Sequence, residues 1–179
     1  SDVGTESGDG GALFKYAPPT GFKALTTSNM PDVTITQGSD NFNTVLYTGN
    51  ASTLSVTGVG FQPDWVWIKS RAATRYHMLY DVVRGTTKAI RPYLTTSQVT
   101  NSNTLTSFDS NGFSVGTDSD VNTNAEAFVS WNWKAGGSAS TNSDGSVNST
   151  VSANPDAGFS IVQYEGLSSG TQTVGHDLN

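Results

Sequence analysis

The chain has 179 residues, of which 13% are charged, and its formal net charge of −6 argues against duplex nucleic acid as a partner. It has no cysteine, which excludes a disulfide scaffold and a thiolate site. It also has no apolar run near the length of a bilayer span, so membrane insertion is not expected. Four Trp, six Tyr and eight Phe supply enough large apolar side chains for a folded core.

The chain begins with a polar, glycine-rich stretch at residues 1–11 that predicts a linker. In the residues that follow, Phe14 and Tyr16 alternate with Lys15 as in a short strand, and a Pro-Pro pair then predicts a turn. A Pro-Asp pair at residues 31–32 breaks the chain, and we expect a new unit to begin at residue 37.

Apolar residues then recur with a period of two on both sides of Gly49-Asn50, which predicts a hairpin with strands at 42–48 and 53–57. The next strand, at 65–68, is apolar on both faces, as is typical of a strand in the middle of a sandwich. Asn111-Gly112 predicts a tight turn. Further strands are predicted at 76–83, 104–108, 112–116 and 126–134.

Small and polar residues dominate the segment 138–158, which we interpret as a linker with one weak strand at 147–151. Residues 159–175 then repeat the pattern of residues 42–57, with one residue inserted. The matched positions are Phe42, Val45, Tyr47, Gly49 and Val56 in the first copy and Phe159, Val162, Tyr164, Gly166 and Val174 in the second.

Because the first copy continues into a Trp-rich strand, we expect residues 159–179 to be the start of a second, truncated module in a longer, multi-module chain. An uncovered hairpin is marginally stable in water. We therefore expect it to be ordered through contacts with a continuation of the chain, a neighbouring subunit or the first module.

Short strands separated by turn signals about every 8 to 12 residues indicate an all-β fold, an antiparallel β-sandwich over residues 37–137. The predicted core consists of Val45, Tyr47, Val56, Trp65, Trp67, Leu79, Phe108, Phe113, Val115, Phe128, Trp131 and Trp133.

Four strings occur in one order: FNTVLYTGNASTLSVTGVGFQPDWVWIKSR, YDVVRGTTKAI, LTSFDSNGFSVGTDSDVN and FVSWNWKAGG. They resemble a concanavalin-like (jelly-roll) β-sandwich module of unknown function in the tail-fibre and receptor-binding proteins of tailed bacteriophages. The resemblance covers about residues 37–137 and resumes at 156–179. The upstream string ALFKYAPPTGFKALTTSNMPD is similar to the last strands of a SPRY-like domain, which implies that residues 1–36 hold a linker and the end of such a domain.

The resemblance implies a non-enzymatic virion protein at the surface of the extracellular particle, in a tail fibre or receptor-binding appendage for host attachment. A capsid decoration or capsid-fibre protein is one alternative, and a carbohydrate-binding domain of a secreted bacterial protein is another. The expected partners are other virion proteins, copies of the chain itself (a homo-oligomer, with a trimer by analogy to phage fibres) and a host cell-surface glycan. No cofactor is expected.

The residues themselves give no pattern typical of an enzyme. A glycosidase needs two facing carboxylates, yet the three Glu residues, Glu6, Glu126 and Glu165, lie in separate segments and share no motif with a second acid. His77 and His176 lie outside any recognisable nucleophile arrangement. We therefore expect no catalytic residue.

Asp118, Asp120 and Asn122 place oxygen side chains at alternating positions and are candidates for a calcium site. The segment lacks the central Gly and closing Glu of the twelve-residue calcium loop. Asp and Asn also cluster in turns because they hydrogen-bond their own backbone. We favour a turn and expect no bound metal.

Six of the nine basic residues lie between positions 69 and 91, where Asp81 is the only acid: Lys69, Arg71, Arg75, Arg84, Lys88 and Arg91. One interpretation is a surface for anionic ligands, since Arg forks suit the phosphates and carboxylates of a bacterial surface. The other interpretations, which we favour jointly, are a solvated loop or a strip that pairs with an acidic neighbouring subunit.

The tryptophans also have two interpretations. Trp65 and Trp67 project to one face of their strand, and Trp131 and Trp133 to one face of theirs. The two pairs form either an aromatic platform on which sugar rings stack, or the two halves of a sandwich core. Large aromatic side chains on neighbouring strands usually fill a core, so the sequence favours the core.

Overall fold

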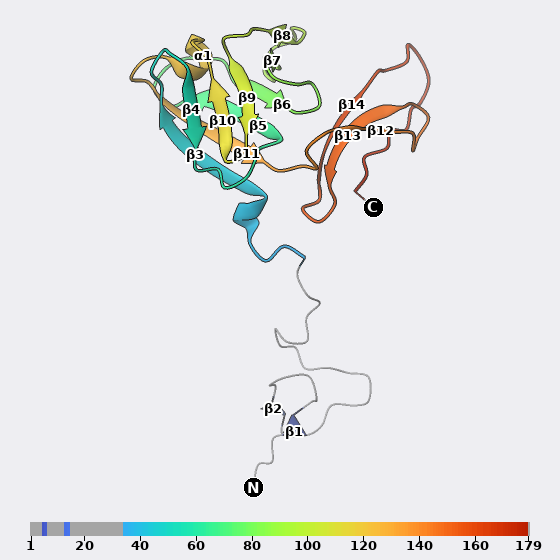
Figure 1. The fold of residues 1–179 in the computed structure, drawn as a ribbon. Coiled ribbons are helices and arrows are strands. Elements are labelled where there is room, and N and C mark those ends of the chain that lie inside the picture. The colour runs from blue at the N-terminus through green and yellow to red at the C-terminus, as the bar shows by residue number, and fades with distance from the viewer. Residues whose placement is uncertain (1–4, 7–12, 15–33, 179) are drawn as a thin grey trace. The chain divides into compact units, whose positions relative to one another are not determined.

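The computed structural model of the protein describes residues 5–6, 13–14 and 34–178 (Figure 1). Its contacts divide the chain into two units, residues 1–36 and residues 37–179. In the first unit, β1 (Thr5–Glu6) pairs antiparallel with β2 (Leu13–Phe14). The rest of the segment that resembles a SPRY-like domain lies outside the described residues.

Two antiparallel sheets form a β-sandwich, as Figure 1 shows. The first sheet has the strand order β3 (Phe42–Thr48), β11 (Ala127–Trp133), β5 (Trp65–Ser70) and β6 (Met78–Asp81). The second has the order β4 (Leu54–Thr57), β10 (Gly112–Val115) and β9 (Leu105–Asp109). Buried residues of both sheets form one hydrophobic cluster between them. The predicted all-β, antiparallel sandwich is therefore confirmed.

Shorter elements flank the two sheets. A two-stranded ribbon joins β7 (Lys88–Ala89) to β8 (Val99–Thr100), and a bridge between Leu79 and Ile90 connects this ribbon to β6. The 3-10 helix η2 (Gly38–Asp40) precedes β3. The helix α1 (Ser119–Asn122) lies between β10 and β11. No helix among the described residues is long and apolar enough to cross a membrane.

The predicted core is correct for three valines and for four aromatic residues. Val56, Phe113, Val115 and Phe128 are buried in the cluster, and three half-buried residues pack against it, namely Val45, Tyr47 and Phe108. The prediction is wrong for the other members of the list, none of which lies in the cluster: Trp65, Trp67, Leu79, Trp131 and Trp133.

Strand parity explains the error. In β5, burial alternates so that Val66 and Ile68 point into the sandwich, and the tryptophans on either side of Val66 point out. Successive side chains of a strand point to opposite faces of the sheet. If one tryptophan is assigned to the wrong face, every second residue of the strand is therefore also assigned to the wrong face. Trp67 and Trp131 do lie side by side, with ring centroids 5.3 Å apart, but on neighbouring strands of one sheet rather than across the sandwich.

The hairpin predicted at residues 42–57 is wrong, although both strands exist. β3 pairs with β11 in the first sheet, whereas β4 pairs with β10 in the second. The turn at Gly49 therefore carries the chain from one sheet to the other. At this turn a Cβ on Gly49 would lie 2.2 Å from the carbonyl oxygen of Thr123, so the close approach requires glycine.

The tight turn predicted at Asn111-Gly112 is confirmed. It joins β9 to β10 in an antiparallel hairpin, in which Gly112 pairs with Asp109. Gly112 has φ of +148°, a conformation that favours glycine, and a Cβ there would lie 2.0 Å from the carbonyl oxygen of Val56.

A third sheet occupies the region interpreted as a linker. It has the strand order β12 (Ser140–Asn142), β13 (Ser149–Asn154) and β14 (Phe159–Tyr164), all antiparallel. The linker interpretation of 138–158 is therefore wrong, apart from its weak strand, which overlaps β13. In β13, Ser149, Val151 and Ser152 are buried, because small side chains allow close packing in this sheet.

The second copy of the repeat does not form a hairpin of its own. β14 matches β3, but β14 pairs with β13, and Val174 forms a parallel bridge with Val147. Phe159 at the start of β14 stacks on Trp65, with ring centroids 5.7 Å apart and an interplanar angle of 10°. Of the three sources of cover that we expected, the first module supplies the contact with Trp65. The strand that pairs with β14 comes from the segment before it, the region interpreted as a linker.

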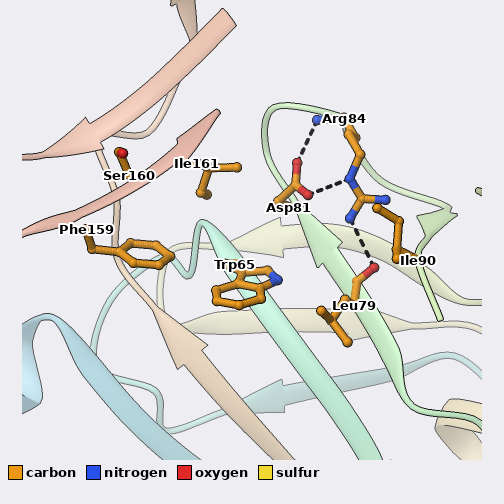
Figure 2. Close-up of a pocket in the computed structure, with 8 residues that line it drawn as sticks. All are labelled: Trp65, Leu79, Asp81, Arg84, Ile90, Phe159, Ser160 and Ile161. Atoms are coloured by element: carbon orange, nitrogen blue, oxygen red, sulfur yellow. Dashed lines mark hydrogen bonds and ion pairs between the residues drawn. The ribbon is translucent and has the colours of Figure 1, made fainter. Parts of the chain in front are cut away.

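Figure 2 shows a cavity at this junction, lined by Trp65, Leu79, Asp81, Arg84, Ile90, Phe159, Ser160 and Ile161. It has a volume of about 230 Å³. The rings of Trp65 and Phe159 form one side, and the ion pair between Arg84 and Asp81 lies on another. The junction between the sandwich and the third sheet is therefore mainly aromatic and aliphatic.

Candidate functional site

The four tryptophans lie on the outer face of the first sheet in two cross-strand rows. The first row runs from Phe42 through Trp133 to Trp65, with successive ring centroids 4.8 Å apart. The second row pairs Trp131 with Trp67. All four indoles are half-buried, so each keeps part of its ring surface accessible. The sequence placed them in pairs correctly but assigned them to the wrong face.

The protein itself covers part of the first row. The ring of Phe159 stacks on Trp65 and also lies 6.2 Å from the ring of Trp133. The second row has no such stacked ring from the third sheet among the described residues. The pair of indoles without a stacked ring from the third sheet is therefore Trp67 and Trp131, which we call the aromatic face.

The aromatic face continues beyond the edge of the sheet. The indole Nε1 of Trp67 donates a hydrogen bond to Nδ1 of His77 at 3.1 Å, and the rings of His77, Tyr93 and Tyr76 follow in series. Tyr93 is 51% exposed and Tyr76 40% exposed. Burial, followed by the positive charge of Lys69, lowers the pKa of His77 below its ordinary value of 6.5. A neutral His77 keeps Nδ1 free to accept this bond.

Beside the aromatic face lies an open groove of about 780 Å³, lined by Lys69, Ala73, Thr74, Arg75, Tyr76, His77, Tyr93, Ser119 and Asp120. Its volume is in the range of pockets that hold small ligands. The walls combine aromatic rings with hydroxyl, imidazole and charged groups. The groove therefore offers apolar contact on one side and hydrogen-bond partners on the other.

The basic residues do not form one free cationic surface. Arg75 pairs with Glu126 at 3.1 Å, and Arg84 pairs with Asp81 at 2.6 Å. Arg91 lies 3.8 Å from Asp120 and also stacks over the ring of Tyr76. The sequence missed two of these pairs because their acids, Glu126 and Asp120, lie far from the basic stretch in the chain.

The other three basic residues differ from these arginines. Lys88 is exposed on β7, away from β5 in the strand order. Lys69 and Arg71 lie at the end of β5, and neither forms an ion pair within the part of the chain that the structure describes. The predicted anionic-ligand residues thus divide into three paired arginines, one distant lysine and two cations that follow Trp67 along the chain at the end of β5.

The carboxylate of Glu126 is bound by neighbouring side chains of the protein. Its carboxylate accepts hydrogen bonds from the guanidinium of Arg75 and from the hydroxyl of Ser70. These bonds, that of Arg75 first, lower the pKa of Glu126 below its ordinary value of 4.5. A catalytic general acid needs the opposite shift, since it must hold its proton near neutral pH.

The three calcium candidates bind protein groups. Asp118 accepts a hydrogen bond from the backbone N–H of Asp120 and another from the side chain of Asn101, both at 2.8 Å. The buried amide of Asn122 donates to the carbonyl of Gly116 at 2.7 Å. The oxygens of Asp120 face the backbone N–H of Tyr76 at 3.4 Å and the guanidinium of Arg91 at 3.8 Å. The side-chain oxygen of Asn122 accepts from the backbone N–H of Asn50 at 2.8 Å. Among the described residues, no group of three or more His, Cys, Asp or Glu residues is arranged to hold a metal ion.

Comparison with known proteins gives a family but no described relative. Neither the curated proteins nor the solved structures contain a match to this chain. Residues 37–179 match the family described as Domain of unknown function (DUF7483). This range includes both sheets of the sandwich and the third sheet. Because the match covers most of the chain, the chain belongs to the DUF7483 family.

Proposed function

We propose that residues 37–179 form a non-enzymatic carbohydrate-binding module whose aromatic face holds a glycan. The observation that carries this proposal is the pair of half-buried indoles, Trp67 and Trp131, side by side on an outer sheet face next to a polar groove. The C–H faces of sugar rings pack on aromatic rings, and their hydroxyls need hydrogen-bond partners. The aromatic face supplies the first and the groove supplies the second.

The resemblance to phage tail-fibre modules supports the setting that we propose. In that setting the module, with a concanavalin-like or jelly-roll topology, belongs to a tail fibre or receptor-binding appendage at the surface of a virion. It acts there with other virion proteins or with copies of itself, and it attaches the particle to a host cell-surface glycan. Binding alone is sufficient for attachment, so the proposal assigns no catalytic residue.

A glycan array with the 179-residue chain tests the proposal, followed by titration of the best ligand while tryptophan fluorescence is recorded. Trp67→Ala and Trp131→Ala should each raise the dissociation constant by about tenfold, since an aromatic contact contributes roughly 1 kcal/mol beyond burial. The matched control is Tyr164→Ala, because Tyr164 is 52% exposed on the third sheet, outside the aromatic face. This variant should bind like the unmodified chain.

Two results would contradict the proposal. One is an array on which the unmodified chain binds no glycan, and the other is binding that neither tryptophan variant weakens. If the chain instead binds purified virion proteins and binds no glycan, the result would favour a decoration protein on the particle over an attachment protein.

A further inference from the structure

Two cations lie in line with the tryptophans along one strand. β5 presents Trp65, Trp67 and Lys69 on its outer face. Arg71 follows with the same parity, and its backbone N–H donates to the carbonyl of Ala127 at 2.8 Å, which extends the ladder by one residue. Alternate residues of a strand are about 6.5 Å apart. The strand therefore carries indole rings first and positive charges next.

The structure leaves both charges without an acidic partner among the described residues. The ammonium of Lys69 donates to the carbonyl oxygens of Ser70 at 2.8 Å and Ala73 at 3.4 Å, which fixes its position beside the groove. An ammonium has three donors, so one N–H remains for a ligand. The groove also contains the carboxylate of Asp120, but this group faces Arg91 at 3.8 Å.

We infer that the glycan on the aromatic face carries a carboxylate, as a uronic or sialic acid does, and that Lys69 and Arg71 bind this group. The inference rests on the proposed function. A neutral sugar would leave two unpaired cations next to the bound ring. A carboxylate instead accepts charge-assisted hydrogen bonds from both, and the guanidinium of Arg71 can bind it in a bidentate manner.

The net charge of the chain limits which anions fit. At −6, the chain as a whole repels a long polyanion, so an anionic ligand must gain its affinity from contacts at this site. A sugar ring with one carboxylate combines stacking on Trp67 with a single local charge contact. Single-stranded nucleic acid also stacks on aromatic rings and contacts cations. It is therefore the control ligand that the test must include.

The glycan array for the proposed function should contain carboxylated, sulfated and neutral oligosaccharides together with a thymidine oligonucleotide. The glycans that bind should carry carboxylates. The matched pair is then the best carboxylated ligand and its methyl ester, which has the same ring without the charge. The acid should bind about tenfold more tightly than the ester at low salt, because hydrogen bonds to charged groups are the stronger ones.

Variants assign the effect to residues. Lys69→Gln and Arg71→Gln should each weaken binding of the acid by about fivefold or more and leave binding of the ester unchanged. Lys88→Gln removes the same charge from an exposed position on β7 and should change neither. Trp67→Ala should weaken the acid and the ester alike.

The outcomes separate the two proposals. Equal affinity for the acid and the ester, with both lost in Trp67→Ala, overturns the carboxylate inference and keeps the carbohydrate function. An array with no bound glycan overturns both. Binding of the thymidine oligonucleotide that depends on Lys69 and Arg71, without binding of a carboxylated glycan, also overturns the inference.

Discussion

The two faces of the first sheet carry different side chains and make different contacts. On the inner face, Val66, Ile68 and Phe128 are fully buried against the second sheet. On the outer face, Trp67 and Trp131 are half-buried and lie beside an open groove. The tryptophans therefore lie outside the sandwich, while phenylalanine, tyrosine and aliphatic side chains fill its core. Large aromatic rings at a surface are a feature of binding sites, which is why the outer face is the candidate site.

The difference between the two faces predicts different losses of stability when one residue on each face is truncated, and this is the largest effect that we expect. Phe128→Ala should lower the free energy of unfolding by about 3–5 kcal/mol, since it opens a cavity in a packed core. Trp131→Ala should lower it by about 1–2 kcal/mol, because the indole is half-buried and leaves no enclosed cavity. Urea denaturation of the two variants measures both values. Equal losses would show that the outer tryptophans are core residues after all.

The junction with the third sheet gives a smaller effect. Phe159→Ala removes the ring that stacks on Trp65 and should lower the free energy of unfolding by about 1–2 kcal/mol. Hydrogen exchange should become faster in residues 140–178, because this stacking joins the third sheet to the sandwich. Leu167→Ala, at a 65% exposed position, is the control and should change neither quantity. Unchanged protection in Phe159→Ala would mean that the third sheet does not depend on the aromatic junction.

Glu126 links stability to acid pH. Its pKa is lowered in the folded protein by Arg75 first and then by Ser70, so the ionised form stabilises the fold. This contribution is present above the ordinary value of 4.5 and is lost as the pH falls through the lower folded value. Glu126→Gln should therefore flatten the fall in stability below pH 4.5, measured by urea denaturation across pH. A variant with the same acid profile as the unmodified chain would contradict the role of this carboxylate.

His77 should give the smallest effect on stability, at a pH closer to neutral. Because its pKa is lowered by burial and by Lys69, the unfolded chain binds a proton below pH 6.5 that the folded chain does not bind. Stability should therefore decrease slightly as the pH falls from 6.5 toward the lower folded value. His77→Gln should remove this slope, and Trp67 should show a different fluorescence because it loses its Nδ1 acceptor. An unchanged slope would mean that His77 does not titrate as the geometry implies.

The sequence predicted the strands well because turn signals and alternation are local. Seven of the sandwich strands lie within a few residues of their predicted ranges. The face of the tryptophans was not predictable in the same way, since the string WVWI is apolar at every position and gives no period to orient. The linker error at 138–158 has a related cause. β13 is built from Ser, Thr, Asn and two small apolar residues, and this composition is also typical of a flexible segment.

The candidate site was predictable by residue type but not by arrangement. The sequence singled out both the four tryptophans and the basic stretch as possible ligand contacts. It could not show that Glu126 and Asp120 reach Arg75 and Arg91, because these pairs exist only after the sheets assemble. For the same reason it could not show that Lys69 and Arg71 have no acidic partner among the residues that the structure describes.

The most direct test of the central claim measures glycan affinity and stability on the same Trp131→Ala protein. If the outer face is a binding surface, the dissociation constant should rise by about tenfold while the free energy of unfolding falls by only about 1–2 kcal/mol. Tyr164→Ala should change neither value. A loss of about 3–5 kcal/mol in Trp131→Ala, or an unchanged dissociation constant, would contradict the claim that the tryptophans of this sheet face outward to bind a glycan.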